Sequence, residues 1–265
     1  MSPLALGLVL AAAVFHALWN RLLHVTGDRA ATMAVANLTA GVLLLPATIL
    51  APPHGVLLLI GLSALAETVY ALLLSAAYRR GDLSVAYPLG RGTAPLLVTL
   101  GGWLVLSQQP GLLAIAGAVA LASGMALIAS AGRRAGQGAA VGFALLVGVA
   151  IASYSVIDAR AVSTVSAPGY IGAVFLLTGV LLVCWLRADR ARLRSAAGPG
   201  VRVAVGTAAA YLLVLLAFQH ARAGRVATIR EVSVLLGIWL SGERPGRRVW
   251  IGAACIVTGI VLAAV

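Results

Sequence analysis

The sequence predicts an all-α membrane protein in which ten transmembrane helices form two inverted five-helix repeats. Three observations lead to this expectation: the composition, a series of ten apolar segments, and a similarity between the two halves. Of the 265 residues, 62% are hydrophobic and only 10% are charged, and the mean hydropathy is +1.04. So few charged side chains cannot cover the surface of a soluble domain of this length. We therefore expect the chain to lie in a lipid bilayer.

The apolar segments are long enough to cross a membrane, because about 30 Å of hydrocarbon needs about 20 helical residues at roughly 1.5 Å each. The first segment lacks the basic start and small-residue cleavage site of a signal peptide, so we interpret it as the first span. The ninth is the weakest, since only the run from Val232 to Ser241 is free of charge. Short segments rich in Pro, Gly and Arg separate the expected helices, which cover residues 4–24, 32–51, 56–78, 83–106, 111–130, 139–160, 169–187, 201–221, 226–242 and 248–265.

The arginines predict the orientation in the membrane. All 19 basic residues other than histidine are arginines, and ten crossings would place fourteen of them on one face and three on the other. By the positive-inside rule the arginine-rich face is cytoplasmic, so both termini are expected outside the cytoplasm. The pI near 11.3 does not predict nucleic-acid binding, because the arginines lie in short loops rather than on one basic face. The three arginines of the poor face are Arg160, Arg222 and Arg225.

Residues 1–132 and 133–265 resemble each other at steady offsets and are predicted to be two repeats. Tyr70 matches Tyr211 at an offset of 141, and the turn "SQQPG" matches "GERPG" at 135. Chance similarity between two Ala/Gly/Leu-rich halves is the alternative. Because each copy holds five spans, an odd number, the second copy must enter the membrane inverted. Further matches at 135 join Trp19 with Tyr154, Gly117 with Gly252, and Gly124 with Gly259.

Inverted repeats favour transport, because two copies that face opposite ways can exchange conformations around a site near the middle of the bilayer. Such alternating access needs no nucleotide, and the sequence has no GxxxxGK[ST] loop. The predicted architecture therefore indicates a secondary transporter.

The motifs also resemble a known family. "AYRRGDLSVAYPLGRGTAPLL" with "SQQPG" and "AGAVALASG", and "ATIREVSVLL" with "GERPG" and "IGAACIVTG", are similar to the two repeats of EamA-type members of the drug/metabolite transporter superfamily. "ALWN" in the first span fits as well. The resemblance covers essentially the whole chain. It implies ten helices in inverted repeats and transport of small metabolites or drugs across the cell membrane, often outward.

The chain departs from the family pattern in two places. Arg230 and Glu243 are thirteen positions apart, about one helical turn less than the resemblance implies, so the ninth helix is expected to be short or tilted. Gln108 stands where the second repeat has Glu243. Better-known relatives imply termini inside the cell, whereas the arginines of this chain predict termini outside, and we follow the arginines.

Glu67 is the strongest candidate for chemistry. An ionisable side chain near the bilayer centre costs about 3 kcal/mol on insertion scales, so it is normally retained for a reason. Glu67 lies halfway along the third span, and Ser63 and Tyr70 share its helix face. A carboxyl that takes up and releases a proton would couple transport to protons. Alternatively, Glu67 holds its helix to a neighbour through a hydrogen bond.

Arg91 lies in "YPLGRGTAPLL", where Pro88 lacks an amide hydrogen and two glycines flank the charge. We expect the helix to loosen there and Arg91 to face a cavity, because free backbone groups at membrane depth are tolerated only against protein or water. Its guanidinium would bind a carboxylate or phosphate. Arg230 could do the same from the second repeat unless Glu231 neutralises it. Snorkelling to the headgroups is the alternative for both arginines.

Other side chains are weaker candidates for substrate binding. His16, Trp19 and Asn20 form one stripe of the first span, and Tyr70 and Tyr211 are repeat counterparts. Polar helix contacts, an interfacial tryptophan and interhelical hydrogen bonds are the alternatives. Asp158 and Arg160 are expected at the membrane interface. The four paired glycines are expected to permit close helix packing.

No enzyme, metal or cofactor motif is present in the sequence, since HExxH and GxSxG are absent and Cys184 and Cys255 lack ligand spacing. We expect a secondary transporter of the cytoplasmic membrane that exports a small metabolite or drug, with proton coupling through Glu67. Two other functions stay open: a non-transporting membrane partner or regulatory subunit, motivated by the short ninth helix, and a lipid-linked sugar flippase. The sequence does not decide the substrate, or between monomer and homodimer.

Overall fold

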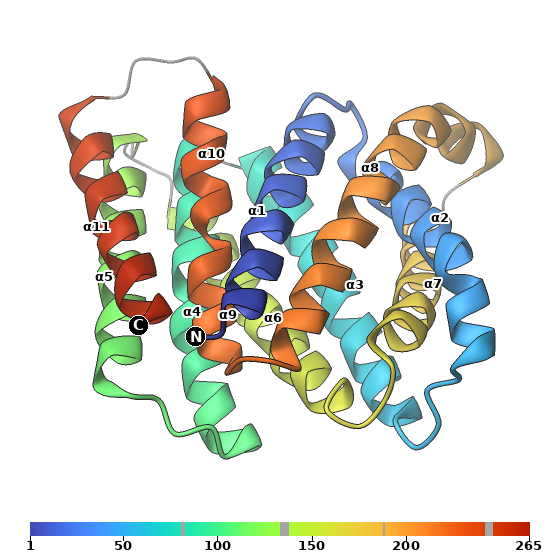
Figure 1. Ribbon diagram of the computed structural model, residues 1–265. Coiled ribbons are helices and arrows are strands. Elements are labelled where there is room, and N and C mark those ends of the chain that lie inside the picture. Colours follow the sequence, from blue (N-terminus) through green and yellow to red (C-terminus); the bar gives the residue numbers. More distant parts are fainter. Residues whose placement is uncertain (81–82, 133–137, 188, 242–245) are drawn as a thin grey trace.

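The computed structural model describes residues 1–80, 83–132, 138–187, 189–241 and 246–265, and all regular secondary structure among them is helical. Both termini lie at the same face of the helical bundle (Figure 1), where the Met1 amino group donates to the Ala264 carbonyl over 2.9 Å. The helices are α1 (Pro3–His24), α2 (Arg29–Leu50), α3 (Leu57–Arg80), α4 (Leu83–Leu106), α5 (Leu112–Gly132), α6 (Gly138–Ala161), α7 (Ala167–Trp185), α8 (Arg190–Phe218), α9 (Ala223–Arg230), α10 (Val232–Ser241) and α11 (Arg247–Ala264).

Nine of these helices are long and apolar enough to cross a membrane, counting only the part of the chain that the structure describes. The ninth expected span, residues 226–242, is instead two helices, α9 and α10, which meet at Glu231. Together they cover residues 223–241, which extend about 28 Å at 1.5 Å per residue. Helix α9 begins at Ala223, three residues before the expected start of this span. The added residues make up for most of the helical turn by which the segment is shorter than the family pattern.

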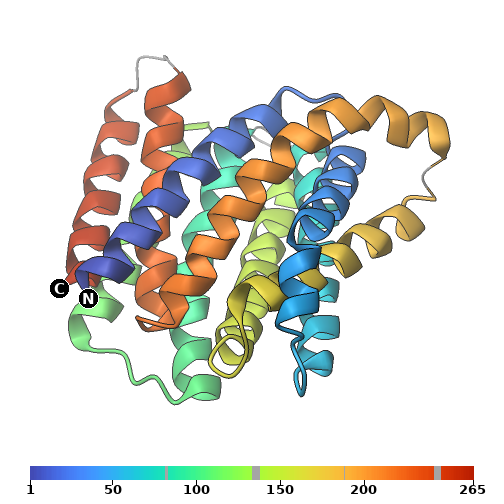
Figure 2. The same ribbon diagram turned by 45° about the vertical axis from the view of Figure 1, so that its right-hand side comes forward.

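Helix α8 differs most from its expected range of 201–221, because it begins at Arg190, in a segment that was expected to be a loop. Asp189 caps this start by accepting a hydrogen bond from the Arg192 amide over 2.7 Å. The segment is rich in Ala, Leu and Arg, which favour helices, and its Gly-Pro pair bends the helix without ending it. Figure 2 shows this first part of α8 turning across the top of the molecule.

Helices of the first half pack against helices of the second half. Helix α1 packs against α8, α9 and α10, and α6 packs against α3 and α4. Helix α2 packs against α7, and α5 packs against α11. Helices α5 and α11 run antiparallel, because Gly117 lies against Gly259 while Gly124 lies against Gly252. A Cβ on Gly124 would be 2.5 Å from the Gly252 carbonyl oxygen, so these glycines permit the close approach that was expected.

The outer surface is apolar, as a lipid-facing surface should be. Leu57 is 74% exposed and Leu104 69%. Trp103, Trp185 and Trp239 are also exposed and lie near helix ends, where membrane proteins commonly place tryptophans at the headgroups. Trp19, in contrast, is only 5% exposed. Its burial separates Trp19 from this interfacial set.

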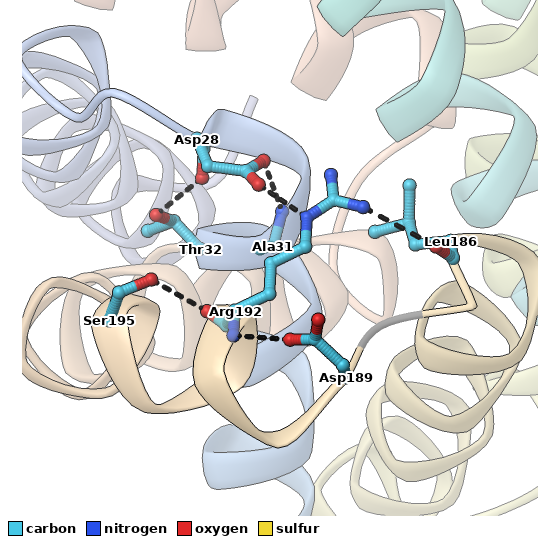
Figure 3. A network of polar contacts seen from close by, with 7 residues as sticks. All are labelled: Asp28, Ala31, Thr32, Leu186, Asp189, Arg192 and Ser195. Atoms are coloured by element: carbon cyan, nitrogen blue, oxygen red, sulfur yellow. Dashed lines mark hydrogen bonds and ion pairs between the residues drawn. The ribbon is translucent and has the colours of Figure 1, made fainter.

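At the face opposite the termini, an ion pair joins the start of α2 to the start of α8 (Figure 3). Arg192 Nε donates to Asp28 Oδ2 over 2.5 Å, and Arg192 Nη1 donates to the Leu186 carbonyl over 3.3 Å. Asp28 Oδ1 also accepts from the Ala31 amide over 3.0 Å, which caps α2. The hydrogen bond from Arg192 is the main reason that the pKa of Asp28 lies below its usual value.

Candidate functional site

A cavity of about 60 Å³ lies between the two halves of the chain, lined by residues of α1, α2, α3, α6, α7, α8 and α9. This volume admits a few water molecules, each of which needs about 10–15 Å³. Drug-sized ligands occupy sites of about 300–1,000 Å³, so this cavity is smaller than the space such a ligand fills. Six of the nine residues proposed from the sequence line the cavity: His16, Trp19, Glu67, Tyr70, Tyr211 and Arg230.

Glu67 enters the cavity from α3 and is 9% exposed. The hydroxyl of Thr178 on α7 donates to Glu67 Oε2 over 3.4 Å, a long and therefore weak hydrogen bond. Ser63, one turn earlier on the same face of α3, is fully buried. The structure thus places the Glu67 carboxyl at a wall that both halves of the chain build.

Aromatic rings form a second wall of the cavity. Tyr154 of α6 lies between Tyr70 and Tyr211, with ring centroids 5.9 and 5.6 Å apart and edge-on geometry. Phe175 of α7 continues the series at 6.3 Å from Tyr211. In the sequence, Tyr154 stands out only as the repeat counterpart of Trp19. Both residues line the cavity, so the repeat correspondence with Trp19 could have predicted that Tyr154 lies at the site.

The stripe on α1 also faces inward. The rings of His16 and Trp19 meet edge-on, with centroids 4.8 Å apart. Asn20 lies one turn from His16, outside the cavity lining, and its Nδ2 is 2.8 Å from His16 Nε2. Asn20 therefore supports the orientation of the imidazole.

Arg91 and Glu231 lie outside the cavity lining and bind each other. Arg91 Nε donates to Glu231 Oε2 over 2.9 Å, and Arg91 Nη2 donates to Ser233 Oγ over 3.2 Å. The two charged side chains are 4% and 1% exposed. An ion pair between Arg230 and Glu231 was the alternative considered from the sequence. The structure instead pairs Glu231 with Arg91, since adjacent residues of a helix point in different directions.

Helix α4 is continuous, which corrects the expectation of a loosened helix around Arg91. Pro88 and Pro95 both lie inside α4. The two glycines beside Arg91 serve packing: a Cβ on Gly90 would be 3.0 Å from the Ala144 carbonyl oxygen, and one on Gly92 would be 2.5 Å from Met125 Cβ. These glycines therefore bring α4 close to α6 and α5.

The helix interruption lies instead at Glu231, between α9 and α10. The Glu231 amide donates to the Thr228 carbonyl over 3.2 Å, which tightens the last turn of α9. Arg230 ends α9, where the helix dipole favours a cation, and Glu231 precedes α10, where it favours an anion. Arg230 is 4% exposed and lines the cavity, and its Nε is buried without a hydrogen-bond partner. It therefore presents a buried cation to the cavity.

Asp158 was expected at the membrane interface together with Arg160, but only Arg160 is exposed. Asp158 is fully buried and accepts hydrogen bonds from Tyr170 over 2.6 Å and from Tyr211. The hydroxyl of Ser63 lies beside the same carboxylate. The sequence could have predicted the burial of Asp158, because this residue falls inside the expected span and lies one helical turn from Tyr154.

Apolar helices that enclose a cavity with buried charges define a multi-pass membrane protein with an internal polar site. Residues 138–265 match the sequence model of the EamA-like transporter family. That family is part of the drug/metabolite transporter superfamily, so the match, which covers just under half of the chain, confirms the resemblance seen in the sequence. The family indicates a transporter rather than an enzyme.

One solved structure, described only as "Crystal structure of protein", is similar over 99% of this chain and 97% of its own length, with a TM-score of 0.69. The two chains are 17% identical, so the similarity shows a common fold alone. None of the curated proteins matches the chain.

Proposed function

We propose that this protein is a secondary transporter that moves a small metabolite or drug across the cytoplasmic membrane by alternating access. The cavity is the observation that carries the proposal, because helices of both halves line it and it contains Glu67 and Arg230. Buried ionisable groups in membrane-spanning helices are costly, and they commonly mark substrate or proton paths. A site between two halves is the arrangement that alternating access needs, because each half can move about it.

The packing supports two inverted five-helix repeats, 1–132 and 133–265. Exchanging the halves maps the contact of α1 with α8 onto that of α6 with α3, and the contacts of α1 with α9 and α10 onto that of α6 with α4. The glycine contacts are reciprocal, since Gly117 and Gly252 are counterparts, as are Gly124 and Gly259. Reciprocal contacts are the mark of a two-fold relation. The proposed boundary between the repeats falls among residues outside the described ranges.

Glu67 is the proposed proton carrier, and we expect export. The carboxyl lines the cavity, where it could exchange a proton with whichever side is open. Inward movement of a proton would then drive outward movement of the substrate. His16, Trp19, Tyr70, Tyr211 and Arg230 are proposed to contact the substrate, and Asn20, Arg91 and Glu231 to support them from outside the lining.

A thermal-shift screen of the purified protein against amino acids, nucleobases, cationic drugs and sugars tests the proposal first, because bound ligand raises the melting temperature. A compound that stabilises the protein is then assayed for flux in proteoliposomes with and without a pH gradient. We expect flux that the gradient accelerates and that no longer responds to pH in Glu67→Gln. Gly61→Ala on the same helix is the matched control, because no atom lies within 4 Å of its added Cβ.

Two outcomes would contradict the proposal. If no compound of a broad panel moves, the protein is better explained as a non-transporting partner. If fluorescent lipid-linked sugars cross the bilayer while soluble compounds do not, it is a flippase. Flux that keeps its pH response in Glu67→Gln would remove the proton role of Glu67 alone.

A further inference from the structure

The buried charges of the described side chains do not balance unless one carboxyl holds a proton. The Nδ2 group of Asn20 is a donor, so its 2.8 Å contact with His16 Nε2 suits a neutral imidazole. Arg91 and Glu231 neutralise each other as an ion pair. One guanidinium then stands against two carboxyls, all three of them buried: Arg230, Glu67 and Asp158.

An uncompensated charge in a buried site is strongly unfavourable, so a group in such a place usually changes its protonation state instead. With both carboxyls ionised the three groups would carry a net charge of −1, and with one proton bound they would carry none. The charge of Asp158 acts directly on Glu67, and Arg230 lines the same cavity as Glu67. Two carboxyls that share one proton titrate as a pair.

The hydrogen bonds indicate where the proton lies in this structure. Asp158 accepts from two phenolic hydroxyls, Tyr170 on α7 and Tyr211 on α8. Two donors suit the ionised form, because a carboxylate is an acceptor only. Glu67 receives only the long hydrogen bond from Thr178 among those that the structure defines. The proton therefore belongs on Glu67, with Asp158 ionised.

We propose that Asp158 is the second protonatable group of the site and that it shares a single proton with Glu67. Tyr211 connects the two, because it lines the cavity beside Glu67 and donates to Asp158. The groups that face Asp158 are Tyr170 from α7, Tyr211 from α8, Ser63 and Glu67 from α3, and Tyr154 on its own helix.

The consequence for opening rests on the proposed transport function. When the proton leaves Glu67 and binds Asp158, the negative charge moves to Glu67, and the new Asp158 hydroxyl must itself donate. The hydrogen bonds from the two tyrosine hydroxyls then weaken, because a neutral carboxyl is a poorer acceptor than a carboxylate. These bonds join α6, α7 and α8 near the end of the cavity that faces the termini, since Asp158 is close to the end of α6 and Tyr170 close to the start of α7. Proton transfer would therefore loosen that end.

Infrared spectroscopy of the purified protein tests proton sharing without any substrate. The C=O stretching band of a protonated carboxyl is recorded at neutral pH for wild type, Glu67→Gln and Asp158→Asn, with Asp28→Asn as a control at an exposed carboxyl. We expect the band in wild type and the control and its loss in both other variants. Asp158→Asn is decisive, because removing that charge leaves Arg230 to be balanced by an ionised Glu67. A band that persists in Asp158→Asn would show independent carboxyls and overturn the proposal.

If Asp158→Asn does not fold, Tyr211→Phe replaces it. Removing one donor makes the ionised form of Asp158 less favourable, so the proton should move to Asp158 and the band should shift in frequency. Gly61→Ala on α3, where no atom lies within 4 Å of the added Cβ, should leave the band unchanged. An unshifted band in Tyr211→Phe would overturn the proposal. These measurements need no transport. They therefore test the proposal of proton sharing independently of the proposed transport function.

Discussion

Arg91 and Glu231 form a buried ion pair that joins α4 in the first half of the chain to the junction of α9 and α10 in the second. The Nε and Oε2 atoms are 2.9 Å apart, and Ser233 binds the same guanidinium. The pair stabilises the only helix junction at which two described helices are separated by a single residue. It also leaves Arg230 as the arginine that faces the cavity.

Breaking this pair from one side should strongly destabilise the protein. Arg91→Met or Glu231→Met leaves an unpaired buried charge, for which we expect a loss of about 3–5 kcal/mol in the free energy of unfolding. The double variant removes both charges and should lose clearly less than the sum of the single variants. Denaturant unfolding of the detergent-solubilised proteins measures this cycle. Additive losses would mean that the two side chains do not interact.

The glycine contacts between α5 and α11 predict a steric effect. Gly124→Ala would place a Cβ 2.5 Å from the Gly252 carbonyl oxygen, and the backbone would have to move. We expect a loss of about 1–3 kcal/mol, as in other overpacked sites. Gly61→Ala, with open space around it, should be neutral or gain up to about 1 kcal/mol because alanine favours helices. Equal melting temperatures for the two variants would contradict the close packing.

The Asp28–Arg192 pair predicts a stability that depends on acid pH. The Arg192 hydrogen bond lowers the folded-state pKa of Asp28. Its contribution is therefore present above the unfolded pKa of about 3.9 and is lost as the pH falls through the lower folded-state value. Since the side chain is 37% exposed, we expect at most about 1 kcal/mol. Unfolding free energies of wild type and Asp28→Asn should therefore converge below about pH 4.

A second substitution separates the ion pair from the helix cap. Asn also caps helices well, so Asp28→Asn should keep the contact with the Ala31 amide, whereas Asp28→Ala should lose a further 1 kcal/mol or so at every pH. If Asp28→Asn were less stable than wild type by the same amount at pH 3 and pH 7, the pair would not be the source of the effect.

Gln108 has a structural role that its place in the family pattern did not reveal. Its Oε1 accepts from the Ala223 amide over 2.9 Å and so caps α9 from the loop between α4 and α5. Gln108→Ala should cost about 1 kcal/mol and speed hydrogen exchange at the start of α9. Gln108→Glu keeps the acceptor and adds a charge that the helix dipole favours, so it should be at least as stable as wild type. Faster exchange in Gln108→Glu as well would contradict this role.

The arginine distribution predicts that the C-terminus lies outside the cytoplasm. A fused phosphatase that is active only outside should be active at Val265, and a fluorescent protein that matures only inside should be dark there. The reciprocal pair of fusions after residue 188, between α7 and α8, should give the opposite result. Cytoplasmic activity at the C-terminus would reverse the orientation.

Most helix ranges could be predicted from the sequence because insertion of a segment into lipid depends on its own apolar residues. The expected helix 83–106 is found as Leu83–Leu106, in spite of its prolines. The start of α8 could not be predicted from hydropathy, since its arginine-rich first turns are helical without being apolar. The helix break at Glu231 could not be predicted either, because it depends on the ion pair with Arg91 on α4.

The residues of the candidate site also differ in whether the sequence alone could predict them. Glu67 could be predicted because a carboxyl in the middle of an apolar span is unusual by itself. Asp158 lies near the end of a span. At such a position the sequence pattern is the same whether the carboxylate is exposed or buried. Only Tyr170 and Tyr211, brought to it from α7 and α8, distinguish the two.

The sequence by itself determined which segments enter the membrane, roughly where most of them begin and end, and that costly charges lie within them, because transfer from water to lipid is a local property of each segment. Tertiary structure alone decided which charge meets which. Glu231 binds Arg91 rather than Arg230, and Asp158 turns inward while Arg160 turns outward. These choices depend on the directions in which helices distant in sequence present their side chains, and packing of the whole bundle sets those directions.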